Sequence, residues 1–135
     1  MSAQDPEFAQ YCCELLASQG PCRARRMFGG WGLSIDGLTL AILADLGEGP
    51  LLWLKADTGS QASFEAAGCA RFSYLAKGQH KSMGYYSAPA EAMESPALMQ
   101  PWAALAFQAA LRAQAGKVKR PGQASPGARK KRTPP

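Results

Sequence analysis

Apolar residues at helical spacing mark both ends of the part of the chain expected to fold. Near the start, a stripe repeating every three to four residues predicts a helix that begins at Asp5-Pro6-Glu7 and ends before Gly20-Pro21. A second helix is predicted from Pro101 to Ala115, after a short turn over 90–100. Pro101 is expected to begin this helix, because a proline ring inside a helix clashes with the carbonyl four residues earlier. Its apolar stripe is expected from Trp102, Leu105, Ala106 and Ala109, widened by Phe107 and Leu111.

Between these helices the pattern changes to short, strand-like segments. A segment over 25–28 runs into Gly29-Gly30, and further segments cover 31–35, 38–43, 51–55, 72–76 and 81–86. Asp36-Gly37 favours a two-residue hairpin turn, because both positions of that turn need positive φ. A short helix over 57–67, ended by Gly68, separates the last two segments from the others.

If the short segment over 25–28 is not counted separately, this arrangement predicts an α+β fold with the element order α-β-β-β-α-β-β-α. We expect a two-layer α/β domain, in which an antiparallel five-stranded sheet carries helices on one face. Hydrophobic residues make up 47% of the chain, which is enough for a core.

Basic charge is distributed unevenly over the 135 residues. The net charge is +5, but residues 1–115 hold eight basic and ten acidic side chains. The other seven basic residues are Lys117, Lys119, Arg120, Arg129, Lys130, Lys131 and Arg132. We therefore expect one domain over 1–115 and a disordered basic tail over 116–135, because the tail has too few apolar groups to offset chain entropy.

The sequence also gives an expectation of location. No apolar run approaches the roughly 20 residues that span a bilayer. The segment from Met1 to Glu7 has neither the basic nor the apolar part of a signal peptide. We expect a cytoplasmic protein that does not contact membranes, and reduced cysteines.

Residues suited to catalysis or ligand binding are few. Gly29–Gly32 could let backbone N–H groups approach a phosphate, but a dinucleotide-binding loop leads into a helix. Here a strand follows, which favours a bulge or tight turn. His80 has no evident carboxylate or nucleophile as a partner, and no Cys-x-x-Cys pair occurs among Cys12, Cys13, Cys22 and Cys69. We expect no enzymatic activity, no cofactor and no metal.

Three arginines precede Met27-Phe28. On a strand, Arg23 and Arg25 share one face and Arg26 takes the other. They are contacts for an anion or a partner, or they are charges that protect an edge strand from aggregation. The second interpretation is favoured, and these arginines are still the first residues of the domain to test for partner binding.

The basic tail also has two interpretations. Clustered Lys and Arg attract nucleic acid by releasing condensed counterions. The tail has no aromatic residue that could stack on bases, so such binding would be weak and independent of sequence. Alternatively, the tail is a solubilising extension without a dedicated partner.

Several short motifs together resemble one known family. The segment Arg25-Arg26-Met27-Phe28-Gly29-Gly30-Trp31-Gly32-Leu33 resembles the signature of the TfoX N-terminal domain family, which contains regulators of natural competence. Further matches follow in the family's order: Leu52-Trp53-Leu54-Lys55-Ala56-Asp57, Phe64-Glu65-Ala66-Ala67-Gly68, Phe72-Ser73-Tyr74, Ser82-Met83-Gly84-Tyr85-Tyr86 and Pro101-Trp102. The resemblance covers about residues 8 to 115.

The resemblance implies a compact α+β fold, similar to that of secretion chaperones, and a role in regulation. The best-known members promote transcription of competence genes together with the catabolite activator protein, and this chain matches only their N-terminal domain. We therefore expect a regulatory or protein-interaction module that acts on transcription through a protein partner. The candidate contacts are Arg25, Arg26, Met27, Phe28, Gly29, Gly30, Trp31 and Gly32. The alternative is an accessory nucleic-acid binder that uses its tail. The partner and the oligomeric state are not predicted.

Overall fold

The computed structural model describes residues 6–27, 30–46 and 49–119, without the side chains of 75, 76, 80–83 and 117–119. Its helices are α1 (Pro6–Leu16), η1 (Ala17–Gln19), α2 (Gln61–Ala66), η2 (Ala90–Glu94) and α3 (Pro96–Lys119). Its strands are β1 (Cys22–Met27), β2 (Gly30–Ile35), β3 (Leu38–Asp45), β4 (Pro50–Lys55), β5 (Arg71–Ala76) and β6 (Gln79–Ser87). The predicted α+β class is confirmed.

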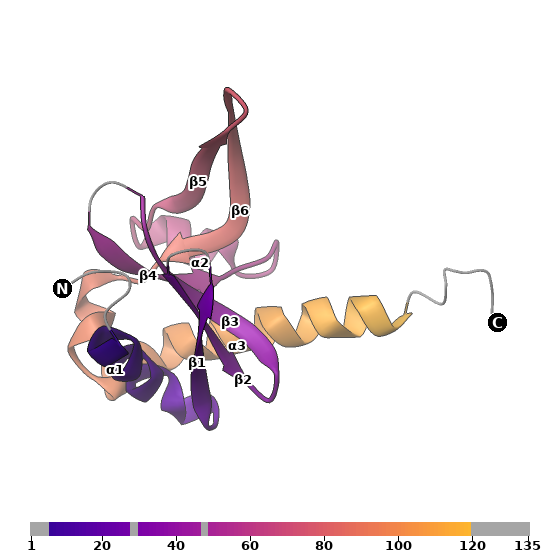
Figure 1. Ribbon diagram of the computed structural model, residues 1–135. Helices are drawn as coiled ribbons and strands as arrows, with labels where there is room; N and C mark the ends of the chain where they lie inside the picture. Colours follow the sequence, from indigo (N-terminus) through magenta and orange to yellow (C-terminus); the bar gives the residue numbers. More distant parts are fainter. Residues whose placement is uncertain (1–5, 28–29, 47–48, 120–135) are drawn as a thin grey trace.

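The strands form one antiparallel sheet in the order β1-β2-β3-β4-β6-β5 (Figure 1). It has six strands and not the five we expected, because Cys22–Met27 is a strand of its own that pairs with β2 along its whole length. Consecutive strands are neighbours, except that β6 and not β5 pairs with β4. β5 therefore forms one edge of the sheet, and β1 forms the opposite edge.

Two tight turns join consecutive strands. The predicted hairpin turn at Asp36-Gly37 is confirmed, with φ of 54° and 78°. Lys77 and Gly78 repeat this geometry between β5 and β6, with φ of 52° and 77°. Positive φ at both turn positions matches the right-handed twist of the flanking strands, so each hairpin closes in register.

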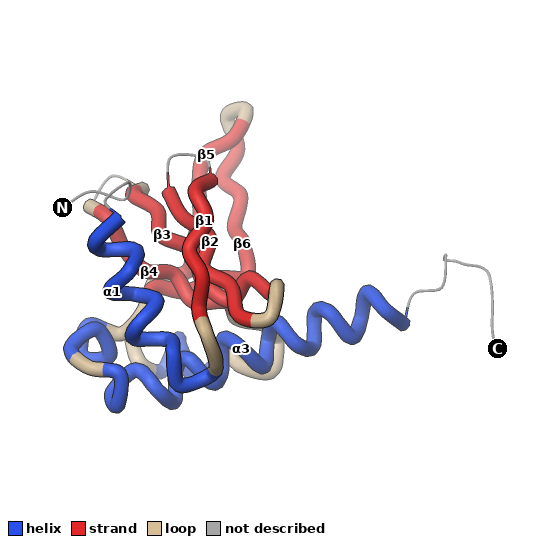
Figure 2. Tube along the Cα trace, turned by 60° about the horizontal axis from the view of Figure 1, so that its bottom comes forward, coloured by secondary structure: helices blue, strands red, loops and turns tan. Residues whose placement is uncertain are grey.

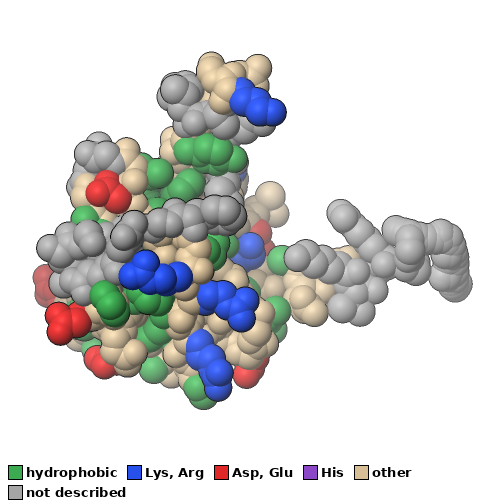
Figure 3. Space-filling view, viewed as in Figure 1, with side chains coloured by type: hydrophobic (Ala, Val, Ile, Leu, Met, Phe, Trp, Pro, Cys, Tyr) green, Lys and Arg blue, Asp and Glu red, His purple; other side chains and the backbone are tan. Residues whose placement is uncertain are grey.

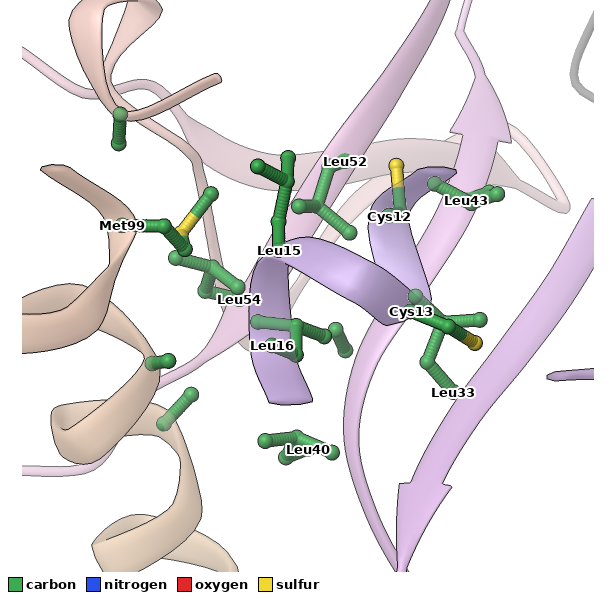
Figure 4. Close-up of a cluster of buried hydrophobic side chains, with 14 of the residues drawn as sticks. Cys12, Cys13, Leu15, Leu16, Leu33, Leu40, Leu43, Leu52, Leu54 and Met99 are labelled. Atoms are coloured by element: carbon green, nitrogen blue, oxygen red, sulfur yellow. The ribbon is translucent and has the colours of Figure 1, made fainter. Parts of the chain in front are cut away.

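The helices cover one face of the sheet, as expected (Figure 2). The apolar stripe of α1 provides the buried side chains of Cys12, Leu15 and Leu16. These meet residues of three strands and α3 in the main core (Figure 4), which includes Leu33, Leu40, Leu43, Leu52, Leu54 and Met99. The hydroxyl of Tyr11 donates to the carbonyl of Met93 and fixes α1 against η2.

A bulge in β3 increases the number of side chains that reach this core. Leu33 pairs with Ala41, but Ser34 pairs with Thr39, so Leu40 is an extra residue opposite β2. A bulge puts two successive residues on nearly the same side of a strand. Leu40 and Ala41 are accordingly both buried in the main core.

The last helix differs from the prediction, because α3 begins at Pro96 and continues through Pro101. Ser95 caps it: its Oγ accepts from the N–H of Leu98 at 3.2 Å, and its carbonyl accepts from the N–H of Met99 at 3.0 Å. Pro101 has no N–H, so the carbonyl of Ala97 receives no helical hydrogen bond. The loss falls in the second turn of a 24-residue helix, where the remaining bonds and the packing of the helix compensate for it.

The buried face of α3 is also rotated from the one expected. Small residues lie against the sheet: Ala103, Ala106, Ala109 and Ala110, with Met99. The predicted Trp102, Leu105 and Phe107 pack at the sides of this ridge, and Leu111 is 46% exposed. The helix also continues to Lys119, so the first residues of the segment expected to be disordered are helical.

Two further contacts tie α2 and the loop before it to the rest of the domain. Phe64 of α2 stacks on Tyr86 with centroids 5.5 Å apart and packs against Trp102 of α3 at 5.3 Å. Before α2, the carboxylate of Asp57 accepts two bonds from the guanidinium of Arg112, at 2.6 and 2.9 Å. Hydrogen bonding to Arg112 is the main reason why the pKa of Asp57 is lowered.

The alanine ridge of α3 leads to a test of packing. We expect Ala106→Leu to destabilise the domain by about 1–3 kcal/mol, because extra methylenes between α3 and the sheet must displace packed side chains. The matched control is Ala115→Leu, on an exposed position of the same helix. The measurement is urea unfolding followed by circular dichroism. Equal unfolding midpoints for the two variants would show that α3 does not pack tightly through its alanines.

Candidate functional site on the open face of the sheet

The sheet face opposite α1 and α3, here called the open face, carries the candidate site. Strand register defines it, because directly paired residues of antiparallel strands point to the same side. One row of paired residues crosses the sheet in the order Arg25, Gly32, Ile42, Trp53 and Ser87. The next row runs through Arg26, Trp31, Leu43 and Leu52 and ends in the main core, so it belongs to the helix-covered face.

The predicted contact residues are divided between the two faces. Arg25, Met27, Gly30 and Gly32 belong to the open face. Arg26 and Trp31 belong to the other face, where the guanidinium lies 5.2 Å from the centroid of the indole ring. Phe28 and Gly29 lie outside the described residues. The structure therefore brings four of the eight candidates together on one surface.

Two of the three arginines line a groove on this surface. The arginine groove, of about 350 Å³, lies between β1 and β3. Its lining includes Arg23, Arg25, Met27, Gly32, Ser34 and Thr39. Both arginines are exposed, and Figure 3 shows basic side chains gathered over the region of β1. The predicted sharing of one face by Arg23 and Arg25 is confirmed, and so is the edge position of their strand.

A second groove continues from Met27 and is more apolar. The apolar groove, of about 410 Å³, includes Met27, Gly30, Ile42, Ala44, Phe72 and Tyr85 in its lining. Asp45 and Leu46 also line it. Met27 is 40% exposed and lines both grooves, so a ligand lying along β1 would contact a basic surface and an apolar one in succession.

The glycines of the motif allow close packing beside these grooves. A Cβ added to Gly30 would lie 2.0 Å from the carbonyl oxygen of Leu43. A Cβ on Gly32 would lie 2.6 Å from the Sδ of Met27. Gly30 therefore allows β2 to approach the backbone of β3, whereas Gly32 provides room for the Met27 side chain. A strand and not a helix follows these glycines, as expected, so the loop lacks the context of a dinucleotide-binding motif.

An aromatic cluster supports the floor of the apolar groove. Ile42, Trp53, Phe72 and Tyr85 form a second, smaller core on the open face. Trp53 and Phe72 meet edge to face with centroids 5.0 Å apart. Lys55 places its ammonium 5.2 Å from the Tyr85 centroid, so the far side of the cluster also carries a positive charge. Sequence reasoning missed this cluster as part of a site. Alternation within β3 and β4 was the signal that could have identified Ile42 and Trp53.

The cysteines lie away from the open face. The thiol of Cys22 donates a hydrogen bond to the sulfur of Cys13, which raises the pKa of Cys22 and lowers that of Cys13. Burial is the main cause that raises the pKa of Cys12 to about 12. In the part of the chain that the structure describes, no group of three or more His, Cys, Asp or Glu side chains is placed to hold a metal ion.

The candidate nucleic-acid contacts of the tail are hardly described. Lys117 and Lys119 lie in the last turns of α3, but their side chains are outside the described set. The rest of these candidates lie outside the described residues altogether: Arg120, Arg129, Lys130, Lys131 and Arg132.

The comparisons with known proteins agree with the motif analysis. A family model for the TfoX N-terminal domain matches residues 14–110, which is most of the described chain. A search among curated proteins finds no match. Among the residues described, no helix is both long and apolar enough to cross a membrane.

The two glycines provide a matched pair of substitutions. We expect Gly30→Ala to destabilise the domain by about 1–3 kcal/mol or more, because the new methyl group meets a backbone carbonyl that cannot move without distorting the β2–β3 pairing. Gly32→Ala should be tolerated, because the flexible end of Met27 can rotate away. Thermal unfolding of both variants measures the difference. Similar losses of stability would contradict the distinct roles assigned to Gly30 and Gly32.

Proposed function

Because the chain belongs to the TfoX N-terminal domain family, we propose that it is a cytoplasmic, non-catalytic module that regulates transcription through a protein partner. The observation that carries this proposal is the open face. Arg25, Met27, Gly30 and Gly32 of the first family motif lie on this face, beside two grooves that the described helices leave uncovered.

The chemistry of the open face supports binding more than catalysis. Arginine, methionine and aromatic residues are enriched at protein interfaces, and Arg25, Met27, Phe72 and Tyr85 lie along these grooves. Nucleophilic catalysis uses a nucleophile, a base and a group that orients the base. Ser34 and Thr39 provide hydroxyls in the arginine groove, but no histidine or carboxylate lines that groove among the described residues.

Site-specific photocrosslinking in cells tests this proposal. A photoreactive amino acid replacing Thr39, in the arginine groove, should crosslink to a component of the transcription machinery. The matched control replaces Gln10, on the exposed side of α1. Mass spectrometry of the crosslinked species identifies the partner. Identical crosslinking from both positions, or no transcription component specific to position 39, would contradict the proposal.

A second candidate function, accessory binding of nucleic acid, is favoured by the location of seven of the 15 basic residues after position 115. A variant with Gln at all seven positions should lose affinity for duplex DNA at low salt. For the unchanged chain, the slope of log K against log salt should be no steeper than about −6, because each phosphate contact contributes about −0.9. Fluorescence anisotropy across a salt series measures both quantities. Unchanged affinity in the Gln variant would exclude the tail as the binding element.

A further inference from the structure

We infer that the partner of the open face presents an extended acidic segment, which pairs with the free edge of β1 as an additional strand. This inference rests on the proposed function and adds the chemistry of the partner. The segment would place carboxylates against Arg23 and Arg25 and a large apolar side chain against Met27, at the β1 side of the apolar groove.

β1 lies at an edge of the sheet. It pairs with β2 over all six of its residues, and its other side is an edge of the sheet. Edge strands present unpaired N–H and C=O groups to which an extended peptide can add by main-chain hydrogen bonds. Residues 25–27 are exposed, and they form the half of the strand nearest the apolar groove.

This edge strand is positively charged. Arg23 and Arg25 lie two residues apart on the open face, so their Cα atoms are about 7 Å apart, the same period as in a paired strand. No described carboxylate pairs with either guanidinium in the salt bridges and hydrogen bonds of the structure. A strand with acidic residues at alternate positions would match both charges at once.

The same charges argue against a second copy of the chain as the occupant. The β1 sequence Cys-Arg-Ala-Arg-Arg-Met contains three arginines and no acidic residue. Pairing two such edges would bring like charges opposite one another, which destabilises a sheet. The arginines thus protect the edge from self-association and from basic strands, and they leave acidic strands as the complementary class.

The apolar groove adjoins the end of the same strand. Met27 follows Arg25 by two residues and lines this groove. The groove, of about 410 Å³, has room for a leucine or phenylalanine side chain. In the added strand, the residues opposite Arg23, Arg25 and Met27 would all point to the open face, because side chains along a strand alternate between its two faces. A parallel partner therefore reads acidic-x-acidic-x-apolar, and an antiparallel partner reads the reverse.

Binding of two synthetic peptides to the full chain tests this inference. Each is a threonine peptide with two glutamates at alternate positions and a leucine two positions away, one in each order. We expect one order to bind, and Arg25→Glu to weaken it by about tenfold or more. The matched control is Lys77→Glu, which reverses one exposed charge on the β5–β6 turn and should have less than about a twofold effect. Circular dichroism verifies that both variants fold.

Two further measurements identify the mode of binding. A peptide with lysine in place of glutamate should prefer the Arg25→Glu variant, and bound glutamate peptide should protect those amides of β1 that face away from β2 from hydrogen exchange. Binding without this protection would overturn the edge pairing. Three results would overturn the inference. They are equal effects of Arg25→Glu and Lys77→Glu, absence of binding at about millimolar peptide, and dimerisation of the free chain through β1. Crosslinking from position 39 without peptide binding would leave the proposed function standing and remove only this inference.

Discussion

Close packing of α3 against the sheet is the contact on which the rest of the structure depends. Ala103, Ala106 and Ala110 let the helix approach β3 and β4, and larger residues such as Trp102 fill the space at its sides. Because α1 packs against the same face and against α3, the helical layer is confined to that side. On the opposite face, apolar residues pack instead into a small aromatic cluster, and two grooves lie beside it.

The family motifs therefore serve two different purposes. Phe64, Tyr86 and Trp102 come from three separate motifs, and Phe64 contacts both of the other rings, while Asp57 binds Arg112 of α3. Gly84 lets β6 approach β4 so closely that its carbonyl accepts from the N–H of Ala56 at 2.7 Å. These contacts hold the fold together. In contrast, Arg25 and Met27 of the first motif are exposed on the edge strand, while Gly30 and Gly32 of the same motif are buried beside them.

Local patterns predicted the elements well because their causes are local. The Asp36-Gly37 turn, the first helix and the alternating strands follow from residue types within a few positions of each other. The sixth strand, the bulge at Leu40 and the continuation of α3 through Pro101 depend on pairing and packing with distant segments. The same limit applies to the site: sequence reasoning identified Arg25 and Met27, but only the sheet order places Phe72 and Tyr85 in one groove with Met27.

The charge of the chain has two components that act over different distances. Seven basic residues follow position 115, and their attraction for any polyanion is long-range and decreases as salt screens it beyond a Debye length of about 8 Å. Arg23 and Arg25 belong to a domain whose own charge is slightly acidic, so their effect is local and depends on strand register. An acidic partner would be attracted by the first component and oriented by the second. Selectivity for such a partner would then depend on the geometry of β1, because clustered charge alone does not distinguish one acidic surface from another.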